Sequence, residues 1–319
     1  MNKEYNPLVS IVIPVYNGSN FLKYAIDSAL AQTYKNIEIL VINDGSTDNG
    51  ATRDIALSYG DKIRYFEKEN GGVSSALNYG IKEMNGEWFS WLSHDDEYYP
   101  DKVEKQIEIA RNLDEGERTN SVIYGSFILI DSNGKRILTR NKRRNKVFSG
   151  HEMFSFVVNN NFTQSGLAFL IPKTLFDLGL FDTKYKYIQD EKMWHNFMLS
   201  DVTFYCHKDI IVKSRIHKGQ TSVTQHGLYY EEIAQYAAEL YNRFTENFDR
   251  YESEFITYYR FLIRNRFLEI AENFENYLIQ NNKLSKKLKR IKSAEKMKGT
   301  LFSFLKKVYH AVFKKSSKG

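Results

Sequence analysis

Two adjacent carboxylates follow an apolar stretch in the first third of the chain. Residues 88–97 read WFSWLSHDDE, so a segment predicted to be a buried strand ends on Asp95 and Asp96. Carboxylates at the carboxyl end of a strand lie where open α/β sheets bind ligands. Two neighbouring carboxylates repel each other unless a cation lies between them, and such oxygen ligands suit Mg²⁺ or Mn²⁺. The pair predicts a divalent-metal site that holds a nucleotide diphosphate; capping of the next helix is the alternative.

A second polar loop follows another apolar run, residues 37–42 (IEILVI). Asp44 lies directly after this predicted strand, and a short carboxylate there can accept the imide N–H of a uracil ring. Ser46 and the neighbouring backbone amides can meet ribose or phosphate. The alternative is that Asp44, Ser46 and Asp48 cap the following helix.

Two further places in the chain carry groups that suit proton transfer or metal binding. Asp190 and Glu191 start a predicted helix over residues 187–199, and a partly desolvated carboxylate at a cleft makes a general base. Acidic residues also favour the first turn of any helix, where they meet the positive end of its dipole. His217 lies beside Arg215 in a polar loop, where it could ligate the metal, contact a diphosphate or simply be solvated.

The elements that position these residues alternate as strand, loop and helix. This alternation repeats four times in roughly 110 residues, which predicts an α/β fold with a mostly parallel, doubly wound sheet and the loops of interest on one edge. The second half is less regular. Strands are predicted there over residues 121–130, 165–171 and 202–212, and an exposed basic loop over residues 141–146.

From about residue 228 onward only helical patterns remain, rich in aromatic residues and interrupted near residues 247–250 and 281–282. We therefore predict two domains, residues 1–225 and a helical C-terminal region over residues 226–319. The aromatic residues of the second are most simply a packing face.

Composition narrows the class of protein further. The single cysteine, Cys206, excludes a disulfide framework and favours a reducing compartment. The polar start of the chain gives no sign of a secretory signal, and no run of about 18 apolar residues exists to span a bilayer.

The net charge of +6 conceals an asymmetry. Residues 282–319 hold thirteen Lys or Arg and one acid, which leaves 32 of the 45 basic and 38 of the 39 acidic residues for the rest. An acidic body is not a uniformly basic nucleic-acid binder. Apolar residues recur at helical spacing between Leu301 and Val312, and a basic amphipathic helix of this kind lies in a membrane interface. A solvated tail or a homo-oligomer contact is the alternative.

The order of the motifs is more specific than any one of them. The segments PVYN, NDGSTD, ENGGVSSALN, SHDDE and QDEKMW follow one another between about residues 9 and 222. This series resembles the family 2 inverting glycosyltransferases of the bacterial cell-surface glycan type, which have the A-type glycosyltransferase fold. The resemblance implies that residues 1–225 form the nucleotide-sugar-binding catalytic domain. It also implies a donor site, formed by Pro14, Tyr16 and Asn17 around the nucleoside, Asp44 on the base (usually uracil), Ser46 close by and Asn70 on the nucleotide.

The resemblance also implies the roles of the remaining groups. Asp95 matches the metal-binding end of the family's Asp-x-Asp motif, with Asp96 beside it, and His217 matches a late histidine that contacts metal or diphosphate. Asp190 matches the catalytic base of the family's Glu-Asp pair. Mn²⁺ or Mg²⁺ is the implied cofactor.

Three positions depart from the family pattern. Ser93 stands at the first Asp of Asp-x-Asp, Leu77 replaces an arginine near the diphosphate, and Gln189 replaces the Glu before the base. These changes leave fewer negative metal ligands and one cation fewer near the diphosphate.

The sequence thus predicts metal-dependent, inverting transfer of a sugar from a UDP-sugar to a hydroxyl of a cell-envelope or lipid-linked glycan. The enzyme is expected in the cytoplasm, on the inner face of the cell membrane. A non-catalytic nucleotide-sugar or glycan-binding homologue is the alternative. A membrane scaffold is a further rival, and the lack of GxGxxG after the first strand counts against a dinucleotide-dependent oxidoreductase.

Overall fold

The computed structural model describes residues 5–139, 145–160, 165–217, 219–220, 226–281 and 283. The chain forms two compact units, Met1–Met153 with Gln164–Tyr229 and Phe154–Thr163 with Tyr230–Gly319. This grouping places residues 154–160 with the C-terminal helices. The domain boundary near residue 225 stays a prediction.

The first unit is built on one sheet that has ten strands among the described residues, in the order β3-β2-β1-β4-β9-β6-β10-β5. β7 pairs with β6 and β8 with β10. Their bounds are β1 Val9–Val15, β2 Ile37–Asn43, β3 Arg64–Glu67, β4 Trp88–Trp91, β5 Glu97–Tyr98, β6 Ser121–Ile130, β7 Arg136–Thr139, β8 Lys146–Phe148, β9 Phe169–Pro172 and β10 Thr203–Arg215.

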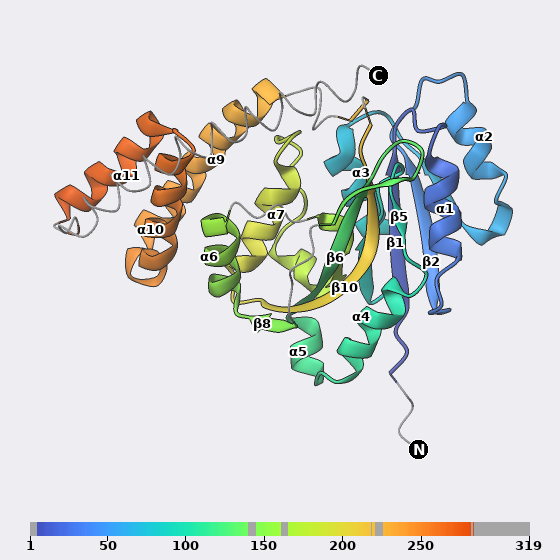
Figure 1. The fold of residues 1–319 in the computed structure, drawn as a ribbon, viewed down its shortest axis with the longest axis horizontal. Helices are drawn as coiled ribbons and strands as arrows, with labels where there is room; N and C mark the ends of the chain where they lie inside the picture. Colours follow the sequence, from blue (N-terminus) through green and yellow to red (C-terminus); the bar gives the residue numbers. More distant parts are fainter. Residues whose placement is uncertain are drawn as a thin grey trace. The chain divides into compact units, whose positions relative to one another are not determined.

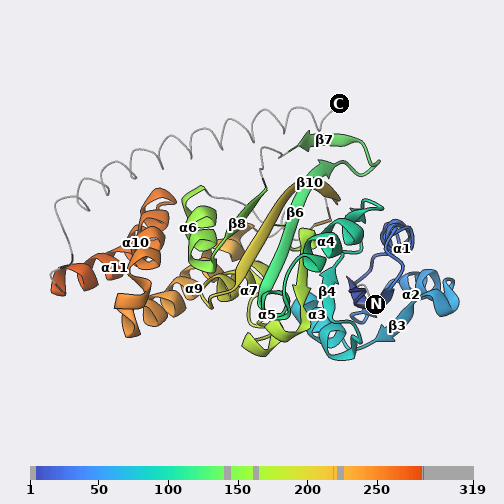
Figure 2. The same ribbon diagram turned by 90° about the horizontal axis from the view of Figure 1, so that it is seen from below.

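Strand direction explains why distant loops meet at one edge of this sheet. β3, β2, β1 and β4 are parallel to one another. β9 is antiparallel to both β4 and β6, and two reversals restore the direction, so β6 runs parallel to β4. β10 lies beside β6 in parallel (Figure 2). The carboxyl ends of β1, β2, β3, β4 and β10 therefore face the same edge.

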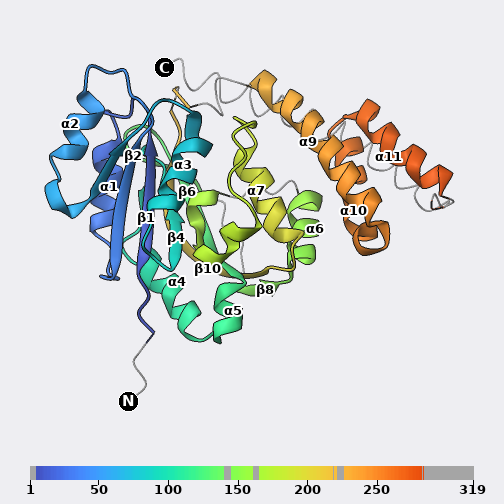
Figure 3. The same cartoon turned by 180° about the vertical axis from the view of Figure 1, so that it is seen from behind.

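Helices cover both faces of the sheet. α1 and α4 lie on one face (Figure 1), and α3 and α7 lie on the other (Figure 3). The strands between them are apolar on both sides because both sides are covered; every residue of β1 is buried. The helices of this unit are α1 Leu22–Leu30, α2 Ala51–Leu57, α3 Gly72–Glu83, α4 Lys102–Arg111, α5 Glu115–Thr119, the start of α6 Gly150–Asn160, and α7 Gln189–Met198. The predicted doubly wound α/β fold is confirmed.

The structure corrects several predicted elements. The strand predicted over residues 165–171 is shorter, because a 3₁₀ turn (η2, Gly166–Ala168) precedes β9. Gly166 lies so close to two indoles that an added Cβ would come within 2.8 Å of Trp91 and 2.7 Å of Trp194. The basic loop predicted over residues 141–146 falls partly outside the described residues, and Lys146 begins β8.

The second unit is helical and packs through aromatic rings. It holds most of α9 (His226–Glu246), together with α10 (Phe248–Arg264), α11 (Leu268–Gln280) and the later part of α6. The Phe255 ring centroid lies 4.7 Å from that of Phe274 and 5.4 Å from that of Tyr277. The predicted C-terminal helical region is confirmed as far as the structure describes it, and α9 and α11 end next to the predicted breaks, at Glu246 and Gln280. A further break at residues 265–267 was not predicted. Within the described part of the chain, no helix is long and apolar enough to cross a membrane.

Candidate active site

The loops after β1 and β2 are joined by side chain to backbone hydrogen bonds. Asn17 has a left-handed backbone (φ 48°), and its side-chain oxygen accepts the N–H of Thr47 at 2.7 Å. The N–H of Asn17 donates to the Ser46 hydroxyl at 2.9 Å. Pro14 is buried within β1, whereas Tyr16 is 45% exposed at the end of the strand. The hydrogen bonds bring Asn17 and Ser46 together at the ends of β1 and β2, with the exposed Tyr16 next to Asn17 in the chain and Pro14 buried in the strand.

Asp44 holds the start of α3 as well as its own loop. Its carboxylate accepts the N–H of Gly71 at 3.1 Å and of Gly72 at 2.7 Å, and the Lys68 ammonium lies 2.7 Å away. A carboxylate is stabilised there by the positive end of the helix dipole. The Asn70 amide donates to the Asp44 carbonyl at 2.9 Å, so two predicted donor-site residues lie together. The base contact assigned to Asp44 stays a prediction.

Helix capping in this region differs in detail from the sequence alternative. Asp48 does bond to the first turn of the following helix, where it accepts the N–H of Thr52 at 3.0 Å, while the N-cap residue itself is Gly50. Ser46 instead donates to Asn43 at 2.7 Å, and Asp44 serves a different helix, α3. Of the three residues, only Asp48 therefore bonds directly to the start of α2.

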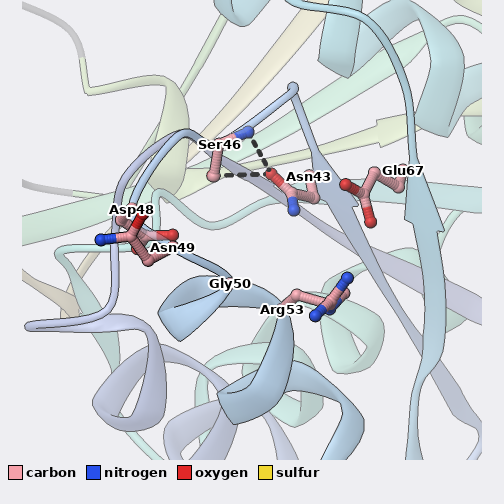
Figure 4. A pocket seen from close by; sticks show the side chains of 7 residues that line it. All are labelled: Asn43, Ser46, Asp48, Asn49, Gly50, Arg53 and Glu67. Carbon is pink, nitrogen blue, oxygen red and sulfur yellow. Dashed lines mark hydrogen bonds between the residues drawn. The ribbon is translucent and has the colours of Figure 1, made fainter.

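A polar pocket of about 250 Å³ lies beside these loops, at the carboxyl ends of β2 and β3 (Figure 4). Ser46 is shared between the pocket and the predicted donor site. Arg53 and Glu67 place opposite charges on its wall. The lining residues are Asn43, Ser46, Asp48, Asn49, Gly50, Arg53 and Glu67.

The structure brings Asp95 and His217 into direct contact. His217 Nε2 lies 3.0 Å from Asp95 Oδ2, across 122 residues of chain, and the Gln220 amide donates to the same oxygen at 3.0 Å. The described residues contain no group of three His, Cys, Asp or Glu side chains suited to a metal. Mg²⁺ is often held by only one or two protein ligands together with substrate phosphates. Asp95 and His217 therefore fit a cation site that a diphosphate completes.

Asp96 is oriented differently from Asp95. It is buried, and its Oδ1 accepts the backbone N–H of Arg215. Burial, and next the charge of Asp95, raises the pKa of Asp96 well above its usual range. At least one of its oxygens is thus committed to β10, and its assignment as a metal ligand stays a prediction.

The predicted general base lies in the first turn of α7. Asp190 is half-buried, and its Oδ1 accepts the N–H of Glu191 at 2.8 Å. Burial raises the pKa of Asp190 to about 6. Burial, followed by the charge of Asp190, raises the pKa of Glu191 to about 7. A carboxylate with such a pKa can accept a proton near neutral pH.

The three departures from the family pattern have distinct surroundings. Leu77 is fully buried in α3, so an apolar side chain fills this position. The Ser93 carbonyl accepts the N–H of Asp96 at 3.1 Å and forms the turn that presents Asp95. Gln189 is 8% exposed, and its Oε1 has no hydrogen-bond partner within the described structure.

Sequence reasoning did not select three residues that the structure places in the site. Lys68 pairs with Asp44, Gln220 contacts Asp95, and Arg215 donates to the Asp95 carbonyl at 2.8 Å. All three lie in loops or at a strand end with no spacing signal. Only their polarity next to predicted site residues could have indicated them.

Comparison with solved structures identifies the fold. S. aureus TarS (residues 1–349) in complex with UDP-GlcNAc matches with a TM-score of 0.62 at 17% identity, over 91% of this chain and 88% of that one. The same protein in complex with UDP matches with a TM-score of 0.60 at 16% identity, over 81% of this chain and 71% of that one. At this identity the likeness concerns the fold, which is the A-type glycosyltransferase fold.

Sequence comparison identifies the family. Residues 10–176, about half of the chain, match the family described as Glycosyl transferase family 2. The chain belongs to this family and is a glycosyltransferase, as its resemblance predicted.

The curated relatives agree with this assignment. An uncharacterized glycosyltransferase of Rickettsia typhi is 50% identical over 223 residues, which are 69% of this chain and 67% of the relative. One of Rickettsia felis is 49% identical over 220 residues, 68% of this chain and 36% of the relative. Glycosyltransferase GlyA of Streptococcus pneumoniae is 31% identical over 226 residues, which are 67% of this chain and 31% of the relative. The chain spans about two thirds of the first relative and about a third of the other two.

Proposed function

We propose that this protein transfers a sugar from a UDP-sugar to a hydroxyl of a glycan acceptor and inverts the anomeric centre. The observation that carries the proposal is the 3.0 Å contact between Asp95 and His217. It joins a carboxylate and an imidazole at the sheet edge that also carries Asp44 and Ser46. A diphosphate with its cation suits that pair, and TarS, which shares the fold, was solved in complex with UDP-GlcNAc.

In the donor site, Asp44 would accept the imide N–H of uracil, with Ser46 and Asn70 beside the nucleotide. The exposed ring of Tyr16 offers an apolar face to the nucleoside, with Asn17 next to it. The cation, Mn²⁺ or Mg²⁺, would be held by Asp95 and His217. When bound it would neutralise charge on the departing diphosphate. The carboxylate of Asp96 would keep the turn in place through β10.

Asp190 would act on the acceptor. Its carboxylate removes the proton from the acceptor hydroxyl while that oxygen forms a bond to the anomeric carbon. The bond from this carbon to the diphosphate oxygen breaks on the opposite face, and UDP leaves with both electrons. One displacement inverts the centre. A carboxylate whose pKa is about 6 is mostly unprotonated at pH 7 and remains basic enough to accept the proton.

A donor screen tests the proposal. Thermal unfolding is followed with UDP, GDP, CDP and ADP, each with Mn²⁺ or EDTA, and hydrolysis of several UDP-sugars is then measured. We expect stabilisation by UDP with Mn²⁺, lost in EDTA, and slow release of UDP from one donor. Stabilisation by another nucleotide alone would contradict the proposed donor class.

A non-catalytic binding homologue is the second candidate, and buried Leu77 favours it because it removes a cation from the site. The same screen separates the two. Stabilisation by UDP with Mn²⁺, with no release of UDP from any donor and no transfer to added saccharides, would favour the binding protein.

We further propose that the enzyme acts in the cytoplasm, bound to the inner face of the membrane through residues 282–319, and that its acceptor is a cell-envelope or lipid-linked glycan. Support comes from the basic residues of that segment, each worth about 1 kcal/mol at an anionic surface. All but one of these residues lie outside the described structure. Deletion of residues 282–319 is expected to abolish sedimentation with anionic vesicles and to preserve transfer to a soluble acceptor. Retained sedimentation would exclude the anchor.

A further inference from the structure

Arg215, the last residue of β10, connects parts of the chain that are distant in sequence. It is 3% exposed. Its Nε donates to the Asp95 carbonyl at 2.8 Å, and its Nη1 donates to the carbonyls of Asp131 at 3.1 Å and Ser132 at 3.2 Å. Its Nη2 pairs with Glu97 Oε1. The guanidinium thus bridges the turn between β4 and β5 and the turn between β6 and β7.

The backbone of Arg215 adds a further contact to the first of these turns. Its N–H donates to Asp96 Oδ1, so Asp95, Asp96 and Glu97 are all held by one residue. Two rings at the start of α1 lie beside the guanidinium, with Phe21 at 4.9 Å and Tyr24 at 5.5 Å from ring centroid to Cζ. A planar group with five donors suits this set of acceptors, whereas the single ammonium of lysine does not.

The position of Arg215 in the chain connects this arrangement to the cation site. His217 follows two residues later, and its imidazole contacts the Asp95 carboxylate. Arg215 therefore fixes the backbone of both members of the pair, Asp95 through its carbonyl and His217 through the end of β10. A cation held by only two protein ligands loses affinity when the turn that carries Asp95 and the loop that carries His217 move apart, because no third protein ligand remains to hold it.

We propose that Arg215 is a positioning residue that sets the separation of Asp95 and His217 and so determines how tightly a divalent cation with a nucleoside diphosphate binds. The proposal rests on the proposed function for its ligand. It assigns Arg215 no contact with the cation, the nucleotide or the acceptor.

Arg64 provides a control in the same unit that is similar in its contacts but more exposed, at 36% of its side chain. Its Nη1 pairs with Glu38 at 2.7 Å and donates to the Glu83 carbonyl at 2.9 Å, and its guanidinium lies 5.2 Å from the Phe66 ring. These are the same kinds of contact as those of Arg215. Arg64 is the first residue of β3 and lies at the amino end of this strand. The site loops follow the carboxyl ends of the strands, on the opposite edge of the sheet.

The experiment compares Arg215→Met, Arg215→Lys and Arg64→Met in the full chain. Binding of Mn²⁺ in the presence of UDP is measured by electron paramagnetic resonance. Hydrogen exchange is measured for peptides that cover residues 93–98, 131–136 and 212–217. We expect both Arg215 variants to weaken Mn²⁺ binding with UDP by at least about ten-fold, and to speed exchange in all three peptides together. Arg64→Met is expected to leave both unchanged.

Kinetics supply a readout that general destabilisation does not give. The Mn²⁺ concentration for half-maximal transfer should rise in the Arg215 variants, whereas kcat at saturating Mn²⁺ should change by less than about three-fold, because the reacting groups remain in place. If Arg215→Met does not fold, Arg215→Lys, which keeps the buried charge, decides. Mn²⁺ binding within two-fold of the parent, or an equal loss in Arg64→Met, would overturn the proposal.

Failure of the proposed function gives a separate result. If the parent protein binds no Mn²⁺ with UDP, the proposed function is wrong, and hydrogen exchange alone decides on Arg215. Joint acceleration in the three peptides then supports its positioning of the two loops, and unchanged exchange overturns it.

Discussion

Substitution of Asp190 by Asn removes the proposed general base and keeps the size of the side chain. General-base assistance is worth about 10²- to 10⁴-fold, or roughly 3 to 5 kcal/mol of barrier. We therefore expect Asp190→Asn to reduce kcat by at least about 100-fold while the binding of UDP with Mn²⁺ stays within about two-fold, because Asp190 is not part of the proposed donor site.

The pH dependence follows from the raised pKa of Asp190, which is about 6. The carboxylate is the active form, so the rate of the parent enzyme should rise with pH and level above about pH 7. At pH 5 about one tenth of the plateau rate should remain. Asp190→Asn should lose this rise.

Stability provides a check on the same substitution. Because the folded pKa of Asp190 lies above the ordinary value of 3.8, the folded protein binds more protons than the unfolded chain between about pH 4 and 6. The free energy of unfolding therefore falls as pH rises through that window. Above about pH 6 the ionised Asp190 destabilises the folded state. The neutral Asn side chain removes this cost, so the variant should be at least as stable as the parent at pH 7.

The assay measures transfer from the donor identified by the screen, from pH 5 to 8, for the parent, Asp190→Asn and Glu191→Gln. Glu191 is the matched control because it lies in the same helical turn and also has a raised pKa. A retained rate above about a tenth of the parent in Asp190→Asn would refute the assignment. A large loss confined to Glu191→Gln would place the base one residue later.

Three further substitutions test other parts of the structure. His217→Ala should raise the Mn²⁺ concentration for half-maximal activity by at least about ten-fold, and unchanged Mn²⁺ dependence would remove His217 from the cation site. Ser93→Asp adds a carboxylate beside Asp95, so the Mn²⁺ concentration for half-maximal activity should fall in the same titration. A rise in that concentration would count against a cation site at Asp95. Gly166→Ala places a Cβ against two indoles and should destabilise the fold by about 1 to 3 kcal/mol in urea unfolding. Gly116→Ala is the control, because the added Cβ meets its nearest neighbour at 3.4 Å. It should leave the free energy of unfolding unchanged.

Much of the fold could be predicted because the strands that carry it are buried on both sides. Val9–Val15 and Ile37–Asn43 are apolar at nearly every position, and this pattern depends only on burial. Helices such as α7 were found through periodicity, and the break at Asn247 was found through its polar residues, whereas α5 and α6 were not predicted.

Other elements had no local signal. β5 is two residues long and exists because Glu97 and Tyr98 pair with β10. The turn at Gly166 depends on how closely Trp91 and Trp194 approach it, which no pattern within the segment encodes.

The candidate site could be predicted only in part, for a similar reason. Motif order selected Asp95, Asp190 and His217 as candidates, but it did not show which side chains are in contact. That Asp96 faces β10 while Asp95 meets His217 depends on the pairing of β5 with β10, a contact between distant segments. The residues that hold the others in place, Arg215 and Gln220, were not selected because their role is visible only in the assembled structure.

The short strand β5 also bears on when a growing chain acquires the proposed cation site. Asp95 emerges from the ribosome 122 residues before its partner imidazole. Among the described residues, β5 pairs with no strand other than β10, so its ladder forms only when Val212 and Lys213 arrive. A nascent chain that ends before β10 therefore carries Asp95 without the contacts from Arg215 and His217. Competence to retain Mn²⁺ should appear late and abruptly during synthesis, once the closing strand is in place.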